Sequence, residues 1–187
     1  TKAIMLVHFA GYMPFDVIEI KNFCKQNNIF LIEDCAHSIG SKINNNIAGS
    51  IGDAGCFSFF STKTITTGEG GMLTTNNENL YKHALSLRER GRDWGHPTEI
   101  YNEGWRNCRI TEFCAVLGLN QMSHINEIID HRNKITHIYE NYILESNIIN
   151  CLPRNKNIRL SLWKHIALLN ENISRDKLKN ILFDKYG

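Results

Sequence analysis

The segment from Cys56 to Lys63 combines a lysine with aromatic and hydroxyl side chains, and this combination can support amine chemistry. It reads Cys56-Phe57-Ser58-Phe59-Phe60-Ser61-Thr62-Lys63. An amine that follows a strand and lies among aromatic rings is partly desolvated, which favours its uncharged, nucleophilic form. Such an amine can form a Schiff base with an aldehyde cofactor, and nearby hydroxyls can bond a phosphate. A solvent-facing lysine at a strand end is the common alternative, and it stays open at this point.

A second segment with chemical potential reads Glu33-Asp34-Cys35-Ala36-His37-Ser38 and ends another apolar run. A carboxylate at the end of a buried strand is costly unless a cation or a hydrogen-bond donor meets it. The protonated nitrogen of a pyridine ring is such a partner. A carboxylate beside it would hold that proton and maintain the ring as an electron sink. Capping of a turn or helix by Asp34 explains the same residue equally well.

Both segments are expected at one edge of a sheet. Apolar runs at residues 4–7, 29–32 and 56–60 predict three buried strands. Between the first two, Asp16 and Glu19 have the spacing of a helix capping box. A strand–helix–strand order implies a right-handed crossover and parallel pairing. Ligands of such sheets bind at the carboxyl ends of the strands, which is where the two segments fall.

The rest of the chain predicts further elements and a second unit. The predicted elements are a strand at 71–75, a helix from Asn77 to about Arg90, a long loop at 91–108, a helical region from Thr111 to about Leu144, a strand at 162–169 and a helix capped by Ser174. We therefore expect an α/β fold. A mainly parallel sheet flanked by helices would occupy residues 1–145, and the start of a smaller C-terminal α+β domain residues 146–187.

Composition excludes several classes of protein. With 42% hydrophobic and 21% charged residues and a formal charge of +2, the 187-residue chain is ordinary for a globular protein. Its basic residues are scattered, so no nucleic-acid partner is expected. No apolar run approaches the roughly 20 residues that cross a bilayer, so no membrane association is expected. The six cysteines include no CxxC pair, which favours reduced thiols and a cytoplasmic location.

Histidines and glycines give no sign of a metal or dinucleotide site. His124, His131 and His137 are seven and six residues apart on a predicted helix, whereas metal ligands on one helix usually sit at three or four. Gly49 and Gly52 belong to a series spaced at threes, which differs from the GxGxxG pattern. The sequence thus predicts no metal ligand.

The combined motifs resemble the fold-type-I nucleotide-sugar aminotransferases of the DegT/DnrJ/StrS family, which depend on pyridoxal 5'-phosphate (PLP). The pieces that carry the resemblance are Asp34-Cys35-Ala36-His37, Gly52-Asp53-Ala54-Gly55-Cys56-Phe57-Ser58-Phe59, Thr62-Lys63 and Gly68-Glu69-Gly70-Gly71. Val7-His8-Phe9-Ala10-Gly11 and the segment Gly104–Glu112 are similar to further family motifs, the latter with one extra residue before Asn107. The likeness spans about residues 4–145.

The resemblance implies a role for each of five residues. Lys63 would form the Schiff base with PLP and move protons during the reaction. Asp34 would pair with the pyridine nitrogen, and His37 would lie against the phenolic oxygen. Ser58 would bind the phosphate, and Asn107 would reach the phosphate of the neighbouring subunit's cofactor. The implied enzyme is a homodimer with shared sites that transfers an amino group, from glutamate, to a keto group of a nucleotide-linked sugar.

Two alternatives remain from the sequence. Family members usually run to about twice this length, and the chain begins at Thr1 directly in a strand pattern. We therefore expect an N-terminally truncated chain, and an incomplete or non-catalytic member of the fold is the first alternative. The second is a sugar 3-dehydratase. Relatives with that activity carry histidine at the position of Lys63, so the lysine favours amino transfer.

Overall fold

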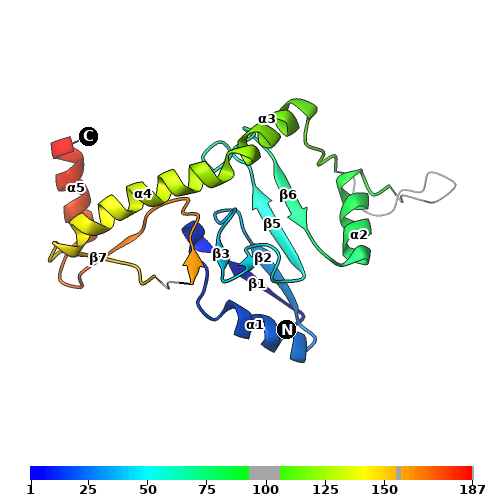
Figure 1. The fold of residues 1–187 in the computed structure, drawn as a ribbon, viewed down its shortest axis with the longest axis horizontal. Helices are drawn as coiled ribbons and strands as arrows, with labels where there is room; N and C mark the ends of the chain where they lie inside the picture. The colour runs from blue at the N-terminus through cyan, green and yellow to red at the C-terminus, as the bar shows by residue number, and fades with distance from the viewer. Residues whose placement is uncertain (93–105, 155–156, 187) are drawn as a thin grey trace.

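A computed structural model describes residues 1–92, 106–154 and 157–186 (Figure 1). The elements, in chain order, are β1 (Ala3–Val7), the 3-10 helix η1 (Phe9–Gly11), α1 (Val17–Gln26), β2 (Phe30–Asp34), β3 (Lys42–Ile43), β4 (Asn46–Ile47), β5 (Ala54–Ser58), β6 (Gly71–Thr74), α2 (Glu78–Arg88), α3 (Glu112–Ser123), α4 (Ile125–Leu144), β7 (Ile149–Cys151), β8 (Ile158–Arg159), β9 (Ala167–Leu169) and α5 (Arg175–Tyr186). Among the described helices, none has the length and apolar character needed to span a membrane.

The main sheet has the order β1-β2-β5-β6. β1 pairs with β2 and β2 pairs with β5 in parallel, whereas β6 runs antiparallel to β5. The predicted α/β fold with a mainly parallel sheet is therefore confirmed. Asp34 ends β2 and aligns with Val7 of β1 and Cys56 of β5. The carboxyl ends of the three parallel strands thus meet at one edge.

The helix and strand ends test three local predictions, of which one is confirmed and two are wrong. Asp16 is the N-cap of α1, yet its side chain makes no capping hydrogen bond, so the predicted capping box is wrong. Asn77 caps α2 as predicted, because its side chain accepts from the N–H of Leu80. The third strand is Ala54–Ser58 and not 56–60. After Ser58 the chain turns into a loop and Phe59 is buried.

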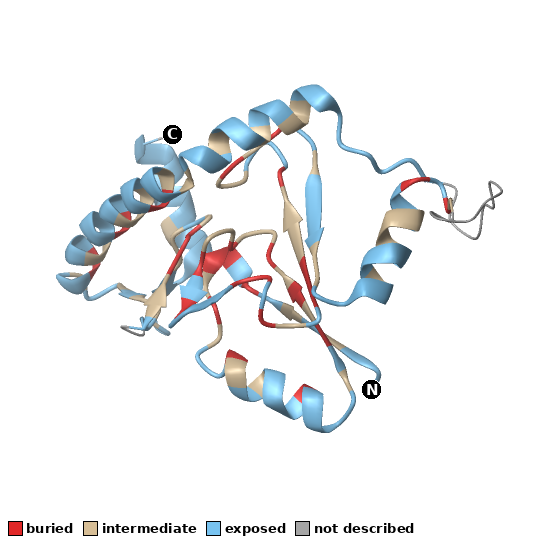
Figure 2. Cartoon of the chain, turned by 45° about the vertical axis from the view of Figure 1, so that its right-hand side comes forward, coloured by how far each residue is buried: buried red, intermediate tan, exposed pale blue. Residues whose placement is uncertain are grey.

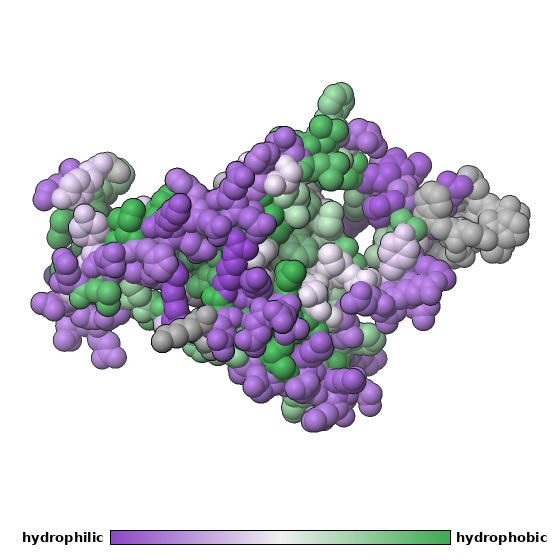
Figure 3. Space-filling view, viewed as in Figure 1, coloured by the Kyte–Doolittle hydropathy of each residue, from purple (hydrophilic) through white to green (hydrophobic). Residues whose placement is uncertain are grey.

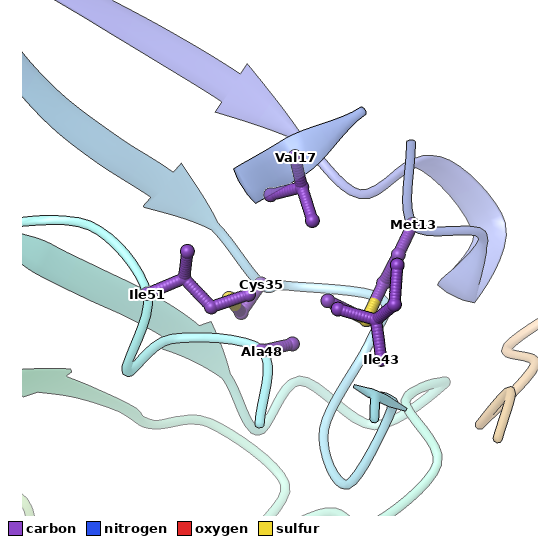
Figure 4. Packing of buried hydrophobic residues seen from close by; sticks show 6 residues of the cluster. All are labelled: Met13, Val17, Cys35, Ile43, Ala48 and Ile51. Atoms are coloured by element: carbon purple, nitrogen blue, oxygen red, sulfur yellow. The ribbon is translucent and has the colours of Figure 1, made fainter. Parts of the chain in front are cut away.

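A compact cluster of apolar side chains lies beyond the carboxyl edge of the sheet. It consists of Met13, Val17, Cys35, Ile43, Ala48 and Ile51 (Figure 4). α1, the turn after β2 and the loop before β5 all contribute to it. Figure 2 shows buried residues gathered around these segments, while the long helices are mainly exposed. Burial of apolar surface by this cluster stabilises the turns that carry the predicted site.

The C-terminal part reaches back to the first part of the chain. β8 pairs antiparallel with β3, and the N–H of Trp163 donates to Ala10 O at 2.9 Å. Arg132 of α4 donates to the carbonyl oxygens of Leu162 and Trp163. The predicted single strand at 162–169 is wrong, because only Ala167–Leu169 forms a strand, β9. The domain boundary near residue 145 stays a prediction.

The helix α3 leaves large apolar side chains in solvent. Phe113 is 91% exposed and Leu119 is 72% exposed. Figure 3 shows apolar surface over α3 and the neighbouring part of the sheet. The apolar spacing in the sequence correctly predicted a helix after Thr111, which caps it through the N–H of Cys114. Helical spacing alone could not predict that this face lies open within the chain.

Candidate active site

A buried carboxylate shapes the edge of the sheet next to the predicted site. Glu33 is fully buried and accepts four hydrogen bonds, from His8 Nε2 and from the N–H groups of Gly49, Ile51 and Gly52, at 2.7–2.9 Å. Burial by itself raises the pKa of Glu33, but these four donors outweigh it and lower the pKa overall. Glu33 therefore fixes the loop before β5 as an ionised structural residue.

Asp34, the next residue, lies half-buried at the carboxyl edge. One of its carboxylate oxygens, Oδ1, accepts from the N–H of Ala36 at 3.0 Å. This bond is the turn-capping role that the sequence left open. The second carboxylate oxygen accepts no hydrogen bond from the described residues, so it is available to another donor. Capping the turn and meeting a ligand are therefore compatible roles for Asp34.

Lys63 lies in a loop, Phe59–Gly70, that follows β5 and is fixed at several points. The N–H of Lys63 donates to Phe60 O, and the ends of the loop are joined by the bond from Phe59 N–H to Gly70 O. Gln121 of α3 bonds both backbone groups of Thr66, each at 2.9 Å. These bonds hold the backbone of the lysine on both sides and reduce the number of positions its side chain can reach.

The amine of Lys63 lies over an aromatic ring and not beside an acid. Its Nζ is 4.7 Å from the ring centroid of Trp163, a cation–π distance. No carboxylate of the described residues is within ion-pair distance of it. The indole N–H of Trp163 also donates to Thr62 O at 2.6 Å. Trp163 therefore contacts both the backbone and the amine of the lysine turn.

His37 lies between these groups. Its ring stacks on Trp163, with centroids 4.0 Å apart and an interplanar angle of 13°. Burial is the main cause that lowers the pKa of His37, the Lys63 amine lowers it further, and Asp34 opposes the change. Lys63 and His37 both contact the Trp163 ring, and Asp34 ends β2 three residues before His37, so the structure brings three predicted residues together at the carboxyl edge. The two groups expected to bracket a cofactor ring lie on the same edge of the sheet.

Hydroxyl groups near the lysine offer donors to an anion. Ser58 ends β5, and its oxygen accepts a long bond, 3.4 Å, from Phe60 N–H. Its own O–H is not committed in this bond. The hydroxyl of Thr64 is buried and has no hydrogen-bond partner among the described residues. A polar loop with an unpaired buried hydroxyl and an unpaired amine fits a phosphate-bearing aldehyde such as PLP.

Asn107 lies elsewhere. It forms an isolated β-bridge with Glu89, its side-chain oxygen accepts from Arg109 N–H at 3.3 Å, and it is exposed. Among the described residues, Asn107 contacts Glu89 and Arg109 and is not seen to contact Lys63, Asp34 or His37. The neighbouring segment 93–105, which contains most of the predicted functional loop, lies outside the described residues. The structure therefore does not bring Asn107 into the cluster within one chain.

His8, Glu33 and Cys35 form the one group of three described residues whose ligand-type atoms lie close enough to hold a metal, within 4.8 Å of one another. Glu33 already satisfies four protein donors. Burial is the first cause that raises the pKa of the Cys35 thiol, to about 12. A thiol that stays protonated is a poor metal ligand, so this group is structural.

This architecture is the large-domain fold of PLP-dependent transferases of fold type I. Comparison with known proteins makes the assignment narrower. The chain belongs to the DegT/DnrJ/EryC1/StrS aminotransferase family, whose family model matches residues 1–186. The match continues past residue 145, where the motifs in the sequence become thin. The PLP form of a sugar aminotransferase from Streptococcus pneumoniae superposes with a TM-score of 0.79 at 25% identity, over 98% of this chain and 52% of the other.

Individual relatives agree with this assignment. GDP-perosamine synthase of Escherichia coli O157:H7 is 37% identical over 189 residues, which cover 99% of this chain and 50% of the relative. The aminotransferase TlmJ of Streptoalloteichus hindustanus superposes with a TM-score of 0.90 at 25% identity, over 99% of this chain and 50% of the other. GDP-4-keto-6-deoxymannose-3-dehydratase (ColD) gives 0.87 at 25%, over 98% and 52%. The chain thus spans about half the length of these relatives.

Sequence reasoning missed two contributors to the site. Trp163 lies 100 residues after Lys63 in a segment that we predicted to be a plain strand. Ala10 donates its N–H to His37 Nδ1 at 3.2 Å, a backbone contact with no side-chain signature. The only signal was indirect: a tryptophan followed by a lysine inside an apolar run is unusual for a buried strand.

Proposed function

We propose that this chain provides the PLP-binding part of an aminotransferase that moves an amino group to a keto group of a nucleotide-linked sugar. Membership of the family and similarity to GDP-perosamine synthase support this reaction class. The observation that carries the proposal is the Lys63 amine, which lies over the Trp163 ring that stacks on His37 and has no carboxylate partner among the described residues. An amine without a carboxylate partner does not have to break an ion pair before it bonds an aldehyde.

Lys63 would hold the cofactor through its amine and would be the group that moves protons during the reaction. When bound, PLP supplies an electron sink for the charge that develops during proton removal. Asp34, through the carboxylate oxygen not used by the turn, would hold the proton of the pyridine nitrogen. His37 would lie against the phenolic oxygen. Amino transfer from a donor, for which we propose glutamate, then proceeds in two half-reactions.

Two further residues are proposed to bind the cofactor's phosphate. Ser58 would donate its hydroxyl from the end of β5, within the same subunit. Asn107 would serve the site of a second subunit. This role agrees with its exposure and with its contacts, which are to residues outside the Lys63 cluster. The active form would therefore be a homodimer with shared sites. We place it in the cytoplasm, where it would act on a nucleotide sugar and an amino donor.

The second candidate is sugar 3-dehydration, which the similarity to ColD brings into consideration. A dehydratase would require, at this position, a residue that does not bond the cofactor covalently. Lys63 has an amine that can bond the cofactor again after each half-reaction, and this favours amino transfer. An incomplete protein without activity of its own is the remaining alternative.

The test is covalent capture of PLP. The chain is mixed with PLP, its absorbance near the visible edge is recorded, and borohydride is added before peptide mapping by mass spectrometry. We expect the reduced adduct on the peptide that contains Lys63 and its loss in Lys63→Ala. Lys164→Ala is the matched control, because the Lys164 amine also lies over Trp163, at 4.2 Å, and its removal should leave the adduct in place.

The outcome separates the candidates. Labelling spread over several surface lysines, unchanged in Lys63→Ala, would overturn the proposal. Site-specific labelling, together with release of 2-oxoglutarate when glutamate is added to a separate, unreduced sample with PLP, supports amino transfer. Labelling without turnover of any amino donor points to the incomplete protein.

A further inference from the structure

The ring of His37 is enclosed by contacts that the proposed function does not explain. Trp163 covers one face in a stacked arrangement. Phe9 meets the ring edge-to-face, with centroids 5.7 Å apart and planes at 70°. The N–H of Ala10 points at Nδ1, at 3.2 Å. A histidine at the edge of a site is thus fixed in plane and in direction.

The contact from Ala10 decides where the proton of His37 sits. A backbone N–H can only donate, so Nδ1 must accept and cannot carry a hydrogen. A neutral imidazole carries one proton, which is then on Nε2. Nε2 is the nitrogen on the far side of the ring from Ala10. The geometry therefore gives His37 one N–H donor, on the nitrogen that Ala10 does not contact.

Ala10 joins His37 to Trp163 through a single residue. Its φ of 56° and ψ of 8° lie in the left-handed region, and its side chain is 1% exposed. Its N–H bonds His37 while its C=O accepts from Trp163 N–H. The neighbouring Gly11, at φ 101°, lies so close to the backbone of Ser161 that a Cβ there would clash. The strained turn is therefore held by the segment that carries Trp163.

We propose that Trp163, together with the Ala10 peptide, is a positioning residue that keeps His37 as the neutral Nε2–H tautomer. This inference rests on the proposed function in one respect, since the Nε2–H group would donate to the phenolic oxygen of PLP. The indole N–H bond to Thr62 O places the same tryptophan against the Lys63 turn. One residue from the C-terminal segment thereby sets the relative position of two site residues.

Burial and two of the three neighbouring charges favour the neutral ring as well. Burial is the largest cause that lowers the pKa of His37, Lys63 and Lys164 lower it further, and Asp34 opposes them. Protonation would also place a hydrogen on Nδ1 against the N–H of Ala10. We expect the neutral tautomer to persist to a pH below the ordinary histidine pKa of about 6.5.

The first experiment measures the tautomer in the chain without PLP. Ring ¹⁵N and ¹³C chemical shifts of His37, assigned by comparison with His37→Gln, distinguish Nε2–H from Nδ1–H. We expect Nε2–H in the unsubstituted chain and in Trp163→Phe, which keeps a stacking ring. In Trp163→Leu we expect a mixture of tautomers and a higher pKa of His37. An Nδ1–H tautomer in the unsubstituted chain, or no change in folded Trp163→Leu, overturns the proposal.

A second measurement covers the case in which Trp163→Leu does not fold. In the variant Trp94→Phe/Trp105→Phe, the only tryptophan is Trp163. A stacked imidazolium quenches indole emission, so fluorescence should fall with the same midpoint as the His37 titration and become insensitive to pH in this range after His37→Gln. A flat titration overturns the stack. Both measurements omit PLP, so failure of Lys63 labelling would sink the proposed function and leave this inference standing.

Discussion

Substitution of Glu33 by glutamine should destabilise the fold by about 3 kcal/mol. The two side chains have almost the same shape, so the change isolates charge and acceptor number. Glu33 is fully buried, and its two oxygens together accept four hydrogen bonds. Glutamine offers one acceptor oxygen and an NH₂ group that can only donate. At least one backbone N–H therefore loses its partner, even if His8 changes tautomer to accept from the amide.

The magnitude follows from the bonds concerned. A hydrogen bond to a charged group contributes roughly 1.5–3 kcal/mol and a neutral one roughly 0.5–1.5, so each bond that survives loses about 1 kcal/mol. An orphaned buried N–H adds about 1–3 kcal/mol. Relief from burying a charge offsets part of this sum, because desolvation costs several kcal/mol for an ion. With three surviving bonds and one orphan, the net cost is about 3 kcal/mol.

Urea denaturation at neutral pH measures this cost. With a slope of about 2 kcal/mol per M, the midpoint should fall by roughly 1.5 M. Glu78→Gln is the matched control, because Glu78 is exposed and pairs only with Lys82 on α2, and it should barely move the midpoint. A midpoint for Glu33→Gln equal to that of the control would show that the carboxylate does not hold the loop.

The pH dependence provides an independent check on the same residue. The pKa of Glu33 is lowered in the folded chain, so its stabilisation is complete above the unfolded value of about 4.3 and disappears as the pH falls through the folded pKa. The stability difference between Glu33→Gln and the unsubstituted chain should therefore shrink below about pH 4. A difference that stays constant down to acid pH would contradict an ionised Glu33.

Three further changes test other parts of the fold. Gly49→Ala should cost roughly 2 kcal/mol or more, because φ is 85° there and a Cβ would overlap the Phe57 ring; an unchanged thermal midpoint would contradict this close approach. Asn77→Ala should cost about 1 kcal/mol through loss of the α2 cap, measured by urea denaturation. Iodoacetamide at mildly alkaline pH should label exposed Cys108 and spare Cys35, whose thiol pKa is about 12; mass spectrometry showing equal labelling would refute the buried, protonated thiol.

The sequence predicted those parts of the fold that depend on local pattern. These parts are strands β1 and β2, the N-caps of α2 and α3, and the end of α2. In each of them the conformational preference of a residue depends on its near neighbours in the sequence. The error at β5 has a tertiary cause, because Phe59 continues the apolar run but bonds across to Gly70 and leaves the strand. The break at 162–169 is also tertiary: Ser161 N–H donates to the buried hydroxyl of Ser41, which redirects the chain.

The site was predictable where it is made of motif residues in adjacent segments. Asp34, His37 and Lys63 follow neighbouring strands, so the topology of a parallel sheet brings them together. Trp163 reaches them through β8, which pairs with a two-residue strand that periodicity cannot reveal. A contact such as that of the Ala10 N–H depends on backbone geometry and not on residue type. Such contacts need coordinates.

The adjacent acids of β2 show how the strand divides two roles that the sequence alone could not separate. Successive side chains of a strand point to opposite faces of the sheet. Glu33 is accordingly turned into the interior, where all its acceptors are used by His8 and the loop before β5. Asp34 faces the other way, is half-buried, and keeps one oxygen outside the turn bond. If the two residues were exchanged, the shorter aspartate at position 33 would not reach the donors that now bond Glu33, and the longer glutamate at position 34 would extend further into the site. The order Glu33-Asp34 therefore matters as much as the presence of two acids, and a double substitution that swaps them should lose both the loop and PLP capture.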